Sequence, residues 1–289
     1  MSQNYQLAVA DLDGTLVSYN SNVVSKSVSE AVRRLRQNGV EFTIATGRSW
    51  AQAKPVVAQL GITAPVIVQT GALVIDPLTE QPIYRKPLRR EIELKLRQMA
   101  PFPGIDQFCL ATNGVYYAAR ITTKGGDWLF NFGEKCRLVQ QWLHRPEEMI
   151  KHLFIGAETD LKQLGLKISQ KIVPTPNLIL WPPDQNSDDW FLEVFDPLTS
   201  KGQALQWLAG YLDVEMKAVI AFGDSVNDLD MLQLAGTGVA IAGAVPEVLA
   251  SASVVIPAPE VDGIGEFLNR LAAAQIPLAE AIGSDDGVA

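Results

Sequence analysis

The feature that most limits what this chain can fold into is an arrangement that recurs along it. A short apolar run is followed at once by a cluster of small and polar residues, and that cluster by a helical pattern. The apolar runs span residues 7–10, 42–45, 66–68 and 218–222. They do not alternate with polar residues, which is typical of strands buried on both faces of a parallel sheet. The chain is therefore predicted to be an α/β protein whose parallel sheet is covered by helices.

The helices between these strands carry terminal signals. Ser27 and Glu30 are expected to form a capping box at the start of the first helix, which Gly39 can close. The next helix is predicted to open at Ser49 and to close at Gly61. Ligands of open α/β sheets bind at the carboxyl ends of the strands. Since the polar clusters follow the strands directly, they are the candidate functional site.

The recurring pattern stops in the middle of the chain. Between residues 85 and 192 the strand-then-cluster arrangement is absent, and prolines and aromatic residues punctuate the sequence instead. We therefore expect an inserted α+β domain at residues 85–192, within a core formed by residues 1–84 and 193–289. Residues 283–289 are expected to be a frayed tail.

Composition and charge exclude some classes of partner. The formal net charge of −8 disfavours nucleic acid and anionic membranes, which bind basic surfaces. The long apolar stretch 236–257 contains Pro246 and Ser251-Ala252-Ser253, so we expect strand, helix and strand rather than a membrane span. Cys109 and Cys136 lack metal-like or redox-like spacing, and the N-terminus lacks signal-peptide features. A cytoplasmic location is expected, and no protein partner is inferred.

Two carboxylates follow the first predicted strand. Asp11 and Asp13 stand two positions apart and are followed by Gly14-Thr15. In phosphoryl transfer, Asp11 could act as the nucleophile, while Asp13 could protonate the leaving oxygen and later activate water. The same spacing also fits an Asx-turn that merely ends a strand. From the residues alone, both interpretations stay open.

A second acidic cluster follows the predicted strand 218–222. It contains Asp224, Asn227 and Asp228. Asn227 could simply cap a helix whose N-terminus Asp228 favours, but this leaves Asp224 unexplained. If both acidic clusters share one sheet edge, their converging carboxylates need a counter-charge. Oxygen ligands favour a hard cation, of which Mg²⁺ is the first candidate.

Two further positions suit an anionic ligand. Lys201 is expected in the first turn of a helix that begins at Ser200, where the helix dipole disfavours a cation. A lysine at this position is easier to explain if it faces an anion or a group of carboxylates. Thr46-Gly47-Arg48, at another strand end, offers a hydroxyl and backbone N–H groups to phosphate, although Thr46 could equally be turn chemistry.

Taken in order, these pieces resemble the haloacid dehalogenase superfamily. The resemblance is carried by Asp11-Leu12-Asp13-Gly14-Thr15, Thr46, Lys201 and Gly223-Asp224-Ser225-Val226-Asn227-Asp228. The insertion between Thr46 and Lys201 resembles the cap domain of the Cof-type (type IIB) phosphatases. Shorter similarities at residues 71–76, 192–194 and 262–264 extend it over nearly the whole chain.

The resemblance implies a Rossmann-like, doubly wound core with a type IIB cap, and a Mg²⁺-dependent phosphatase that forms an aspartyl-phosphate. It implies Asp11 as nucleophile and Asp13 as general acid and base. The implied metal ligands are Asp11, the backbone carbonyl of Asp13, and Asp224. Asp228 is implied as a carboxylate that either faces the metal or contacts the metal ligands. The implied phosphate-binding residues are Leu12, Thr46, Gly47, Arg48, Lys201 and Asn227. We expect a small phosphorylated metabolite as substrate, a sugar phosphate first, with its polar body held by the cap.

Two positions depart from the family pattern, and two other functions remain as alternatives. Thr70 and Gly243 stand at or near positions where the family commonly has asparagine. A phosphosugar mutase of the same superfamily would keep the nucleophile but carries a longer, glycine-richer final motif. A phospho-receiver module would share the acidic pocket, but it needs no cap and normally lacks the aspartate two positions after its phosphoacceptor.

Overall fold

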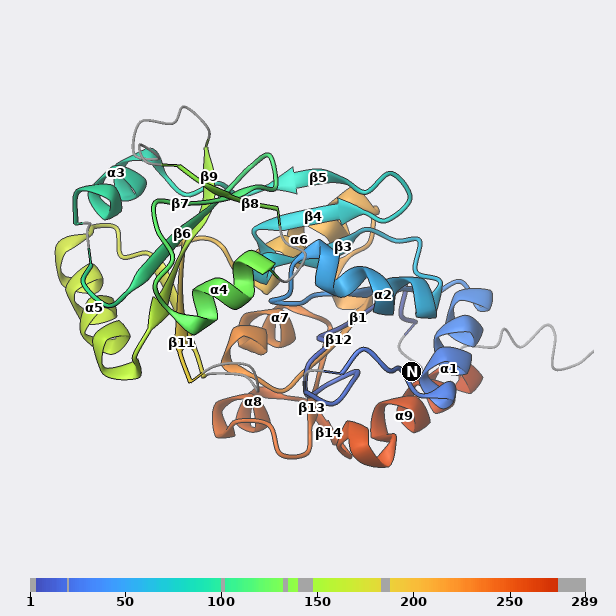
Figure 1. Cartoon of the computed structure of the whole chain (residues 1–289). Coiled ribbons are helices and arrows are strands. Elements are labelled where there is room, and N and C mark those ends of the chain that lie inside the picture. The colour runs from blue at the N-terminus through green and yellow to red at the C-terminus, as the bar shows by residue number, and fades with distance from the viewer. Residues whose placement is uncertain are drawn as a thin grey trace, which may run out of the picture. The chain divides into compact units, whose positions relative to one another are not determined.

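In a computed structural model, the chain forms two compact units (Figure 1). The structure describes residues 4–19, 21–99, 102–131, 135–139, 148–182 and 188–274. The first unit comprises Met1–Tyr84 and Ser200–Ala289, and the second comprises Arg85–Thr199. The predicted tail at 283–289 lies outside the described residues.

The first unit is built on a parallel sheet in the strand order β14-β13-β12-β1-β2. Its strands are β1 (Leu7–Ala10), β2 (Glu41–Ile44), β12 (Val219–Gly223), β13 (Thr237–Ile241) and β14 (Val254–Ile256). β1 lies between β2 and β12, and the first residues of these three strands are level. Their carboxyl ends therefore meet at one edge of the sheet. The strand order confirms the predicted doubly wound α/β core.

Strand β3 (Val66–Val68) joins this sheet less closely than β1 and β2 do. It contacts the edge beyond β2 through a parallel bridge between Ala45 and Ile67. It also leads a separate sheet in the order β3-β4-β5, with β4 (Leu73–Asp76) antiparallel to it and β5 (Gln81–Arg85) beyond. The carboxyl end of β3 therefore still lies beside that of β2.

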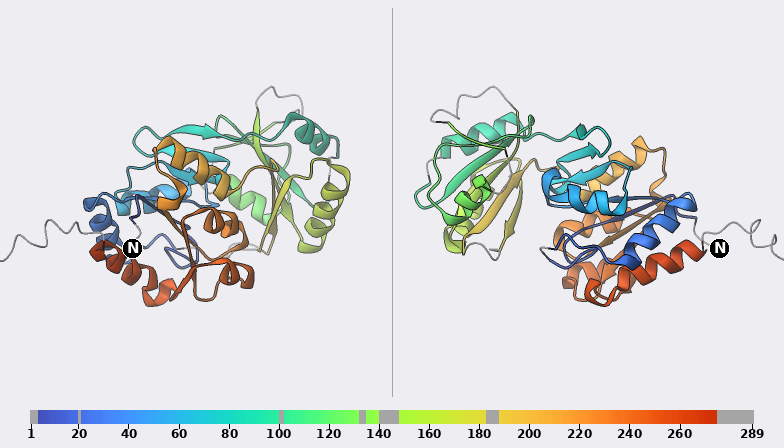
Figure 2. Two further views of the ribbon diagram at one scale, coloured as in Figure 1. Left: turned by 180° about the vertical axis from the view of Figure 1, so that it is seen from behind. Right: turned by 45° about the vertical axis from the view of Figure 1, so that its right-hand side comes forward.

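Helices cover both faces of the parallel sheet (Figure 2). One face packs against α1 (Lys26–Gln37), α2 (Trp50–Leu60) and α9 (Gly263–Ala274), and the other against α6 (Lys201–Tyr211), α7 (Leu229–Leu234) and α8 (Pro246–Ser251). Successive side chains of a strand point to opposite faces. Ala8 and Ala10 thus enter the first cluster, and Leu7 and Val9 the second. This burial on both faces explains why the apolar runs do not alternate.

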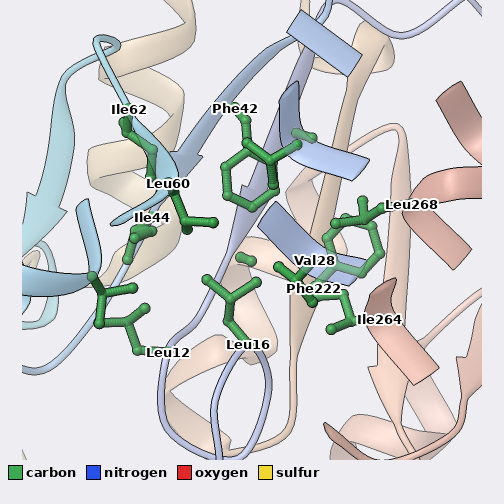
Figure 3. Close-up of a cluster of buried hydrophobic side chains, with 14 of the residues drawn as sticks. Leu12, Leu16, Val28, Phe42, Ile44, Leu60, Ile62, Phe222, Ile264 and Leu268 are labelled. Atoms are coloured by element: carbon green, nitrogen blue, oxygen red, sulfur yellow. The ribbon is translucent and has the colours of Figure 1, made fainter. Parts of the chain in front are cut away.

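The loop after β1 is anchored in the first apolar cluster. Leu12 and Leu16 lie among Phe42, Ile44 and Phe222 in that cluster (Figure 3). Leu12 is fully buried and Leu16 nearly so. Because these two side chains are packed in the core, the aspartates on either side of Leu12 are held at a defined place on the sheet edge.

The helix ends agree with the sequence in one case and correct it in another. Helix α2 opens at Ser49 and closes at Gly61 as predicted; Ser49 forms a capping box with Gln52, and Gly61 is in a left-handed conformation. The capping box predicted for α1 was wrong. Ser25, which has an extended backbone, caps this helix by accepting a hydrogen bond from the N–H of Val28. The helix therefore begins two residues before the predicted position, and Ser27 lies in its first turn.

The second unit is a mixed sheet in the order β10-β11-β9-β6-β7-β8. Its strands are β6 (Asp106–Ala111), β7 (Tyr116–Ala118), β8 (Cys136–Leu138), β9 (Met149–Gly156), β10 (Asn177–Trp181) and β11 (Trp190–Phe195). Helices α3 (Arg90–Met99) and α5 (Glu158–Lys171) enclose one apolar cluster with it. On the other face Trp128, from α4 (Lys124–Asn131), packs edge-on against Phe191.

The second boundary between the units differs from the expected one. Residues 193–199 were expected in the core, yet the second unit extends to Thr199. The reason is strand β11, which pairs antiparallel with both β9 and β10. A strand with hydrogen-bonded neighbours on both sides cannot belong to another unit. The connection back to the first unit therefore comes after β11.

Other expectations concern single segments. Stretch 236–257 forms β13, α8 and β14 as expected, and no helix in the described ranges is long and apolar enough to cross a membrane. Cys109 and Cys136 are both free thiols. Of the two histidines, His144 lies outside the described residues, and His152 is buried in β9 as a packing residue.

The burial of His152 predicts a pH-dependent stability. Its Nδ1 lies 2.9 Å from Gln107 Nε2, and burial, with the charge of Arg97, lowers the pKa of His152 to about 3. The unfolded chain therefore binds a proton that the folded chain does not, at any pH between about 3 and 6.5. Stability supplied by the neutral form is present above about pH 6.5 and is lost as the pH falls.

Urea unfolding of the wild type and of His152→Gln, at pH 7 and at about pH 4.5, checks this expectation. Below pH 6.5 this group should remove at most about 1.4 kcal/mol of unfolding free energy per pH unit. The variant should be less stable at pH 7 but lose less stability on acidification. Equal losses in the two proteins would show that His152 takes up its proton in the folded state.

Candidate active site

The carboxyl ends of β1 and β12 bring the two predicted acidic clusters together. Ligand oxygens of Asp11, Asp224 and Asp228 all lie within 4.8 Å of one another, and all three residues are buried. Asp11 follows β1 directly, while Asp224 and Asp228 lie on the turn after β12. The level register of these two strands places both turns at one edge. Residues more than two hundred positions apart thus form one acidic site.

Lys201 lies between two of these carboxylates. Its Nζ donates to Asp11 Oδ1 at 2.7 Å and to Asp228 Oδ1 at 2.6 Å, and its side chain is fully buried. Ser200 caps α6 as predicted, so Lys201 is the first residue of that helix. Burial alone would lower the pKa of Lys201, but the two carboxylates raise it above its ordinary value. The ammonium group is therefore charged at neutral pH.

One lysine does not neutralise the site. Burial raises the pKa of Asp11 to about 8; Lys201 opposes this shift, and the negative charges of Asp228 and Asp224 add to it. Asp228 is committed to local contacts as well, because its Oδ2 accepts hydrogen bonds from the N–H groups of Asp224 and Ser225. Three carboxylates against one ammonium leave an excess of negative charge that a cation would relieve.

The carboxylate of Asp224 is held by hydroxyl groups. Its Oδ1 accepts from Thr15 Oγ1 at 2.7 Å, and its Oδ2 accepts from Tyr19 at 2.5 Å and from Ser225 at 3.1 Å. Burial is the largest influence and raises the pKa of Asp224, against the effect of these hydrogen bonds. The donor set of the cluster is made of carboxylate oxygens alone. It therefore fits a hard divalent cation such as Mg²⁺.

Tyr19 is a site residue that the sequence analysis missed. Burial and the hydrogen bond to Asp224 raise the pKa of Tyr19 to about 12. Gly14 makes this contact possible, since a Cβ there would lie 2.6 Å from Asp224 Oδ2 and 2.7 Å from the Tyr19 ring. Gly14 also has a φ of +81°, which glycine adopts without strain. No motif marks Tyr19, because its partner is distant in sequence.

Asp13 lies apart from the acidic cluster and pairs with Arg48. Nε of Arg48 donates to Asp13 Oδ2 at 2.8 Å, and Nη2 donates to Oδ1 at 2.5 Å. The side chain of Asp13 does not belong to the group of carboxylates that could hold a metal. Arg48, which is expected to bind phosphate, contacts Asp13, the predicted general acid and base.

The other predicted phosphate-binding residues lie on the same sheet edge. Thr46 follows β2, is buried, and accepts a hydrogen bond from the N–H of Arg48 through Oγ1. Gly47 follows it. Asn227 lies in the 3₁₀ helix η4 (Val226–Asp228), and its buried Oδ1 has no hydrogen-bond partner among the described residues. The side chain of Leu12 packs in the core, so only its backbone could reach a phosphate.

The backbone is left-handed at the two positions that depart from the pattern of the resembled family. Thr70 has a φ of +57° and Gly243 a φ of +92°, both in the left-handed region that asparagine and glycine tolerate. Gly243 meets this requirement without strain, whereas Thr70 is a β-branched residue for which it is unfavourable. The adjacent Gly71 must be glycine, since a Cβ there would lie 2.0 Å from the carbonyl oxygen of Ser200. This turn therefore packs directly against the start of α6.

Comparisons with known proteins identify the family. The family model of the haloacid dehalogenase-like hydrolases matches residues 8–268. A protein of Haemophilus influenzae that is named as a phosphatase is 27% identical over 274 residues, which cover 92% of this chain and 98% of that protein. An HMP-PP phosphatase of Yersinia pseudotuberculosis is 28% identical, over 84% of this chain and 86% of that protein.

A solved structure shares the fold over nearly the whole chain. The subclass IIB sugar phosphatase BT4131 superimposes with a TM-score of 0.74 at 21% identity, covering 92% of this chain and 98% of that one. At this identity the likeness concerns the fold, including the inserted unit. With the family match, these findings lead to one conclusion. The chain belongs to the haloacid dehalogenase-like hydrolases, and it is an enzyme that hydrolyses phosphoric monoesters.

Proposed function

We propose that this enzyme is a Mg²⁺-dependent phosphatase that hydrolyses a small phosphorylated metabolite through an aspartyl-phosphate on Asp11. The observation that carries the proposal is the position of Lys201, which is buried and in contact with both Asp11 and Asp228. A buried lysine beside a carboxylate nucleophile offsets the negative charge that otherwise repels a phosphate dianion. A cluster that served only to stabilise the fold would not need more carboxylates than its lysine can neutralise.

The reaction has two steps, in which Asp11 and Asp13 take different roles. In the first, an oxygen of Asp11 forms a bond to phosphorus, the ester P–O bond breaks, and Asp13 gives a proton to the leaving oxygen. In the second, water forms a bond to phosphorus, its proton passes to Asp13, and the bond between phosphorus and Asp11 breaks. The products are the dephosphorylated metabolite and inorganic phosphate, and Asp11 is regenerated.

The cation and the phosphate are assigned to separate sets of residues. Asp11, the backbone carbonyl of Asp13, and Asp224 would hold Mg²⁺, with Asp228 on the metal side or just behind. When bound, Mg²⁺ supplies positive charge to the phosphate oxygens. Lys201, the Thr46 hydroxyl, the backbone of Leu12 and Gly47, and the Asn227 side chain are the proposed phosphate-binding groups.

We propose a sugar phosphate as the substrate, with the inserted unit selecting the leaving group. Support comes from the fold shared with a subclass IIB sugar phosphatase. HMP-PP is a second candidate, because one relative at 28% identity is named for it. Two free cysteines suit a reducing compartment, and we propose a cytoplasmic location on that ground.

A substrate panel tests this proposal. With Mg²⁺ present, kcat/KM is measured on sugar phosphates, HMP-PP, nucleoside monophosphates and p-nitrophenyl phosphate. We expect a sugar phosphate to exceed p-nitrophenyl phosphate by at least about tenfold, because contacts to the sugar stabilise its transition state. A higher value for HMP-PP would replace the sugar assignment. Isomerisation of a sugar phosphate without phosphate release would indicate a mutase, and a single burst without turnover a receiver.

A further inference from the structure

The hydrogen bonds of Arg48 are not those expected of a phosphate ligand. Its guanidinium makes four hydrogen bonds within the chain, two of them to the carboxylate of Asp13. The others go to the carbonyl oxygen of Ser21 at 2.8 Å and to Asn22 Oδ1 at 2.5 Å. A guanidinium has five N–H groups, so little of its donor capacity remains for another anion. From the sequence alone, the position of Arg48 directly after Thr46-Gly47 predicts that it binds phosphate.

The contacts fix both the carboxylate and the loop beside it. Two parallel hydrogen bonds from one guanidinium define the plane of a carboxylate, which a single bond does not. Arg48 lies directly before Ser49, the cap of α2, and its side chain is largely buried. The carbonyl of Asn22 also accepts a hydrogen bond from Gln59 on the same helix. The orientation of the Asp13 carboxylate is thus set by Arg48 in addition to the anchored turn that carries Asp13.

We propose that Arg48 is a positioning residue that holds Asp13 as the base for hydrolysis of the aspartyl-phosphate, and that it is not a phosphate ligand. This rests on the proposed function. In the hydrolysis step, the water oxygen bonds to phosphorus, the water proton moves to an oxygen of Asp13, and Asp11 leaves. Both oxygens of Asp13 accept hydrogen bonds from Arg48, which fixes the orientation of the carboxylate.

A positioning residue and a phosphate ligand predict different kinetics on p-nitrophenyl phosphate. Its leaving group departs without needing a proton, so the first step depends little on Asp13. In Arg48→Gln we expect kcat to fall by about 10²-fold, while kcat/KM stays within about threefold. The phosphoenzyme should then accumulate. Rapid mixing with Mg²⁺ present should show a burst of p-nitrophenol stoichiometric with the enzyme, and inhibition by inorganic phosphate should be unchanged.

Matched variants separate positioning from folding. Arg36 is the control arginine, because it donates to the carbonyl of Gly61 and to Thr63 at the end of α2 remote from Ser49. Arg36→Gln should leave kcat and the burst as in the wild type. Arg48→Lys keeps the charge but not the paired hydrogen bonds, so it should recover only part of kcat. Asp13→Asn should give the same burst as Arg48→Gln, and the double variant should be no slower than Asp13→Asn.

The possible outcomes separate a failure of the Arg48 assignment from a failure of the proposed function. If Asp13→Asn shows a burst and Arg48→Gln instead loses kcat/KM and affinity for inorganic phosphate, Arg48 is a phosphate ligand and the inference is wrong. If Arg48→Gln behaves like Arg36→Gln, the contact is structural only, and the inference is also wrong. If no variant, Asp13→Asn included, yields a trapped phosphoenzyme, the two-step mechanism itself fails.

Discussion

Asp11→Asn is expected to abolish turnover, lowering kcat by more than about 10⁴-fold, as replacement of a nucleophile does in other enzymes. An amide of the same size keeps the contact to Lys201 but cannot form the acyl-phosphate. Burial raises the pKa of Asp11 to about 8, so its charge is unfavourable in the folded protein. The variant should therefore unfold at the same temperature as the wild type or higher. Loss of activity would then report chemistry and not unfolding.

The measurement is steady-state hydrolysis of p-nitrophenyl phosphate, with calorimetry on the same samples. Asp76→Asn is the matched control, because Asp76 lies on β4 and accepts local hydrogen bonds from Leu78 and Thr79, away from the acidic cluster. It should keep full activity. Mass spectrometry must show that the introduced asparagine has not deamidated back to aspartate. Sustained turnover by an intact Asp11→Asn protein would refute the nucleophile assignment.

Removal of divalent cations should have an effect of similar size. Lys201 pairs with only two of the three buried carboxylates, Asp11 and Asp228, so without a cation the site repels a phosphate dianion. We expect no detectable hydrolysis in excess chelator and full recovery on addition of Mg²⁺. Ca²⁺ should bind but support little turnover, because its larger and less regular coordination sphere places the phosphate differently. Hydrolysis that persists in excess chelator would contradict a metal-dependent mechanism.

Binding can be followed separately from activity. A ligand that binds only the folded state raises the unfolding temperature. Mg²⁺ should therefore stabilise the wild type, and much less so Asp224→Asn, which removes one proposed ligand. The Asp76→Asn control should respond as the wild type does. Equal stabilisation of Asp224→Asn and the wild type would place the cation elsewhere.

Elements whose cause is local could be predicted from the amino-acid sequence. Strands β1 and β3 begin and end where their apolar runs do, because burial on both faces excludes polar residues from the run. Helix α2 follows its Ser49 cap and its closing Gly61, because both satisfy backbone groups within a few residues. The two acidic turns were placed at strand ends by the sequence, and they meet because β1 and β12 are neighbours in the sheet.

Which distant groups become partners depends on how the chain packs, and this could not be predicted from the sequence. Arg48 bonds to Asp13 across 35 positions, and Tyr19 bonds to Asp224 across 205, and no local pattern marks either pair. Strand β11 belongs to the inserted unit because β9 and β10 pair with it, although its sequence would also suit the core. A hydrogen bond depends on where packing brings two groups. Local sequence sets the conformation of a segment, whereas the choice among chemically equivalent partners is made by the packed fold.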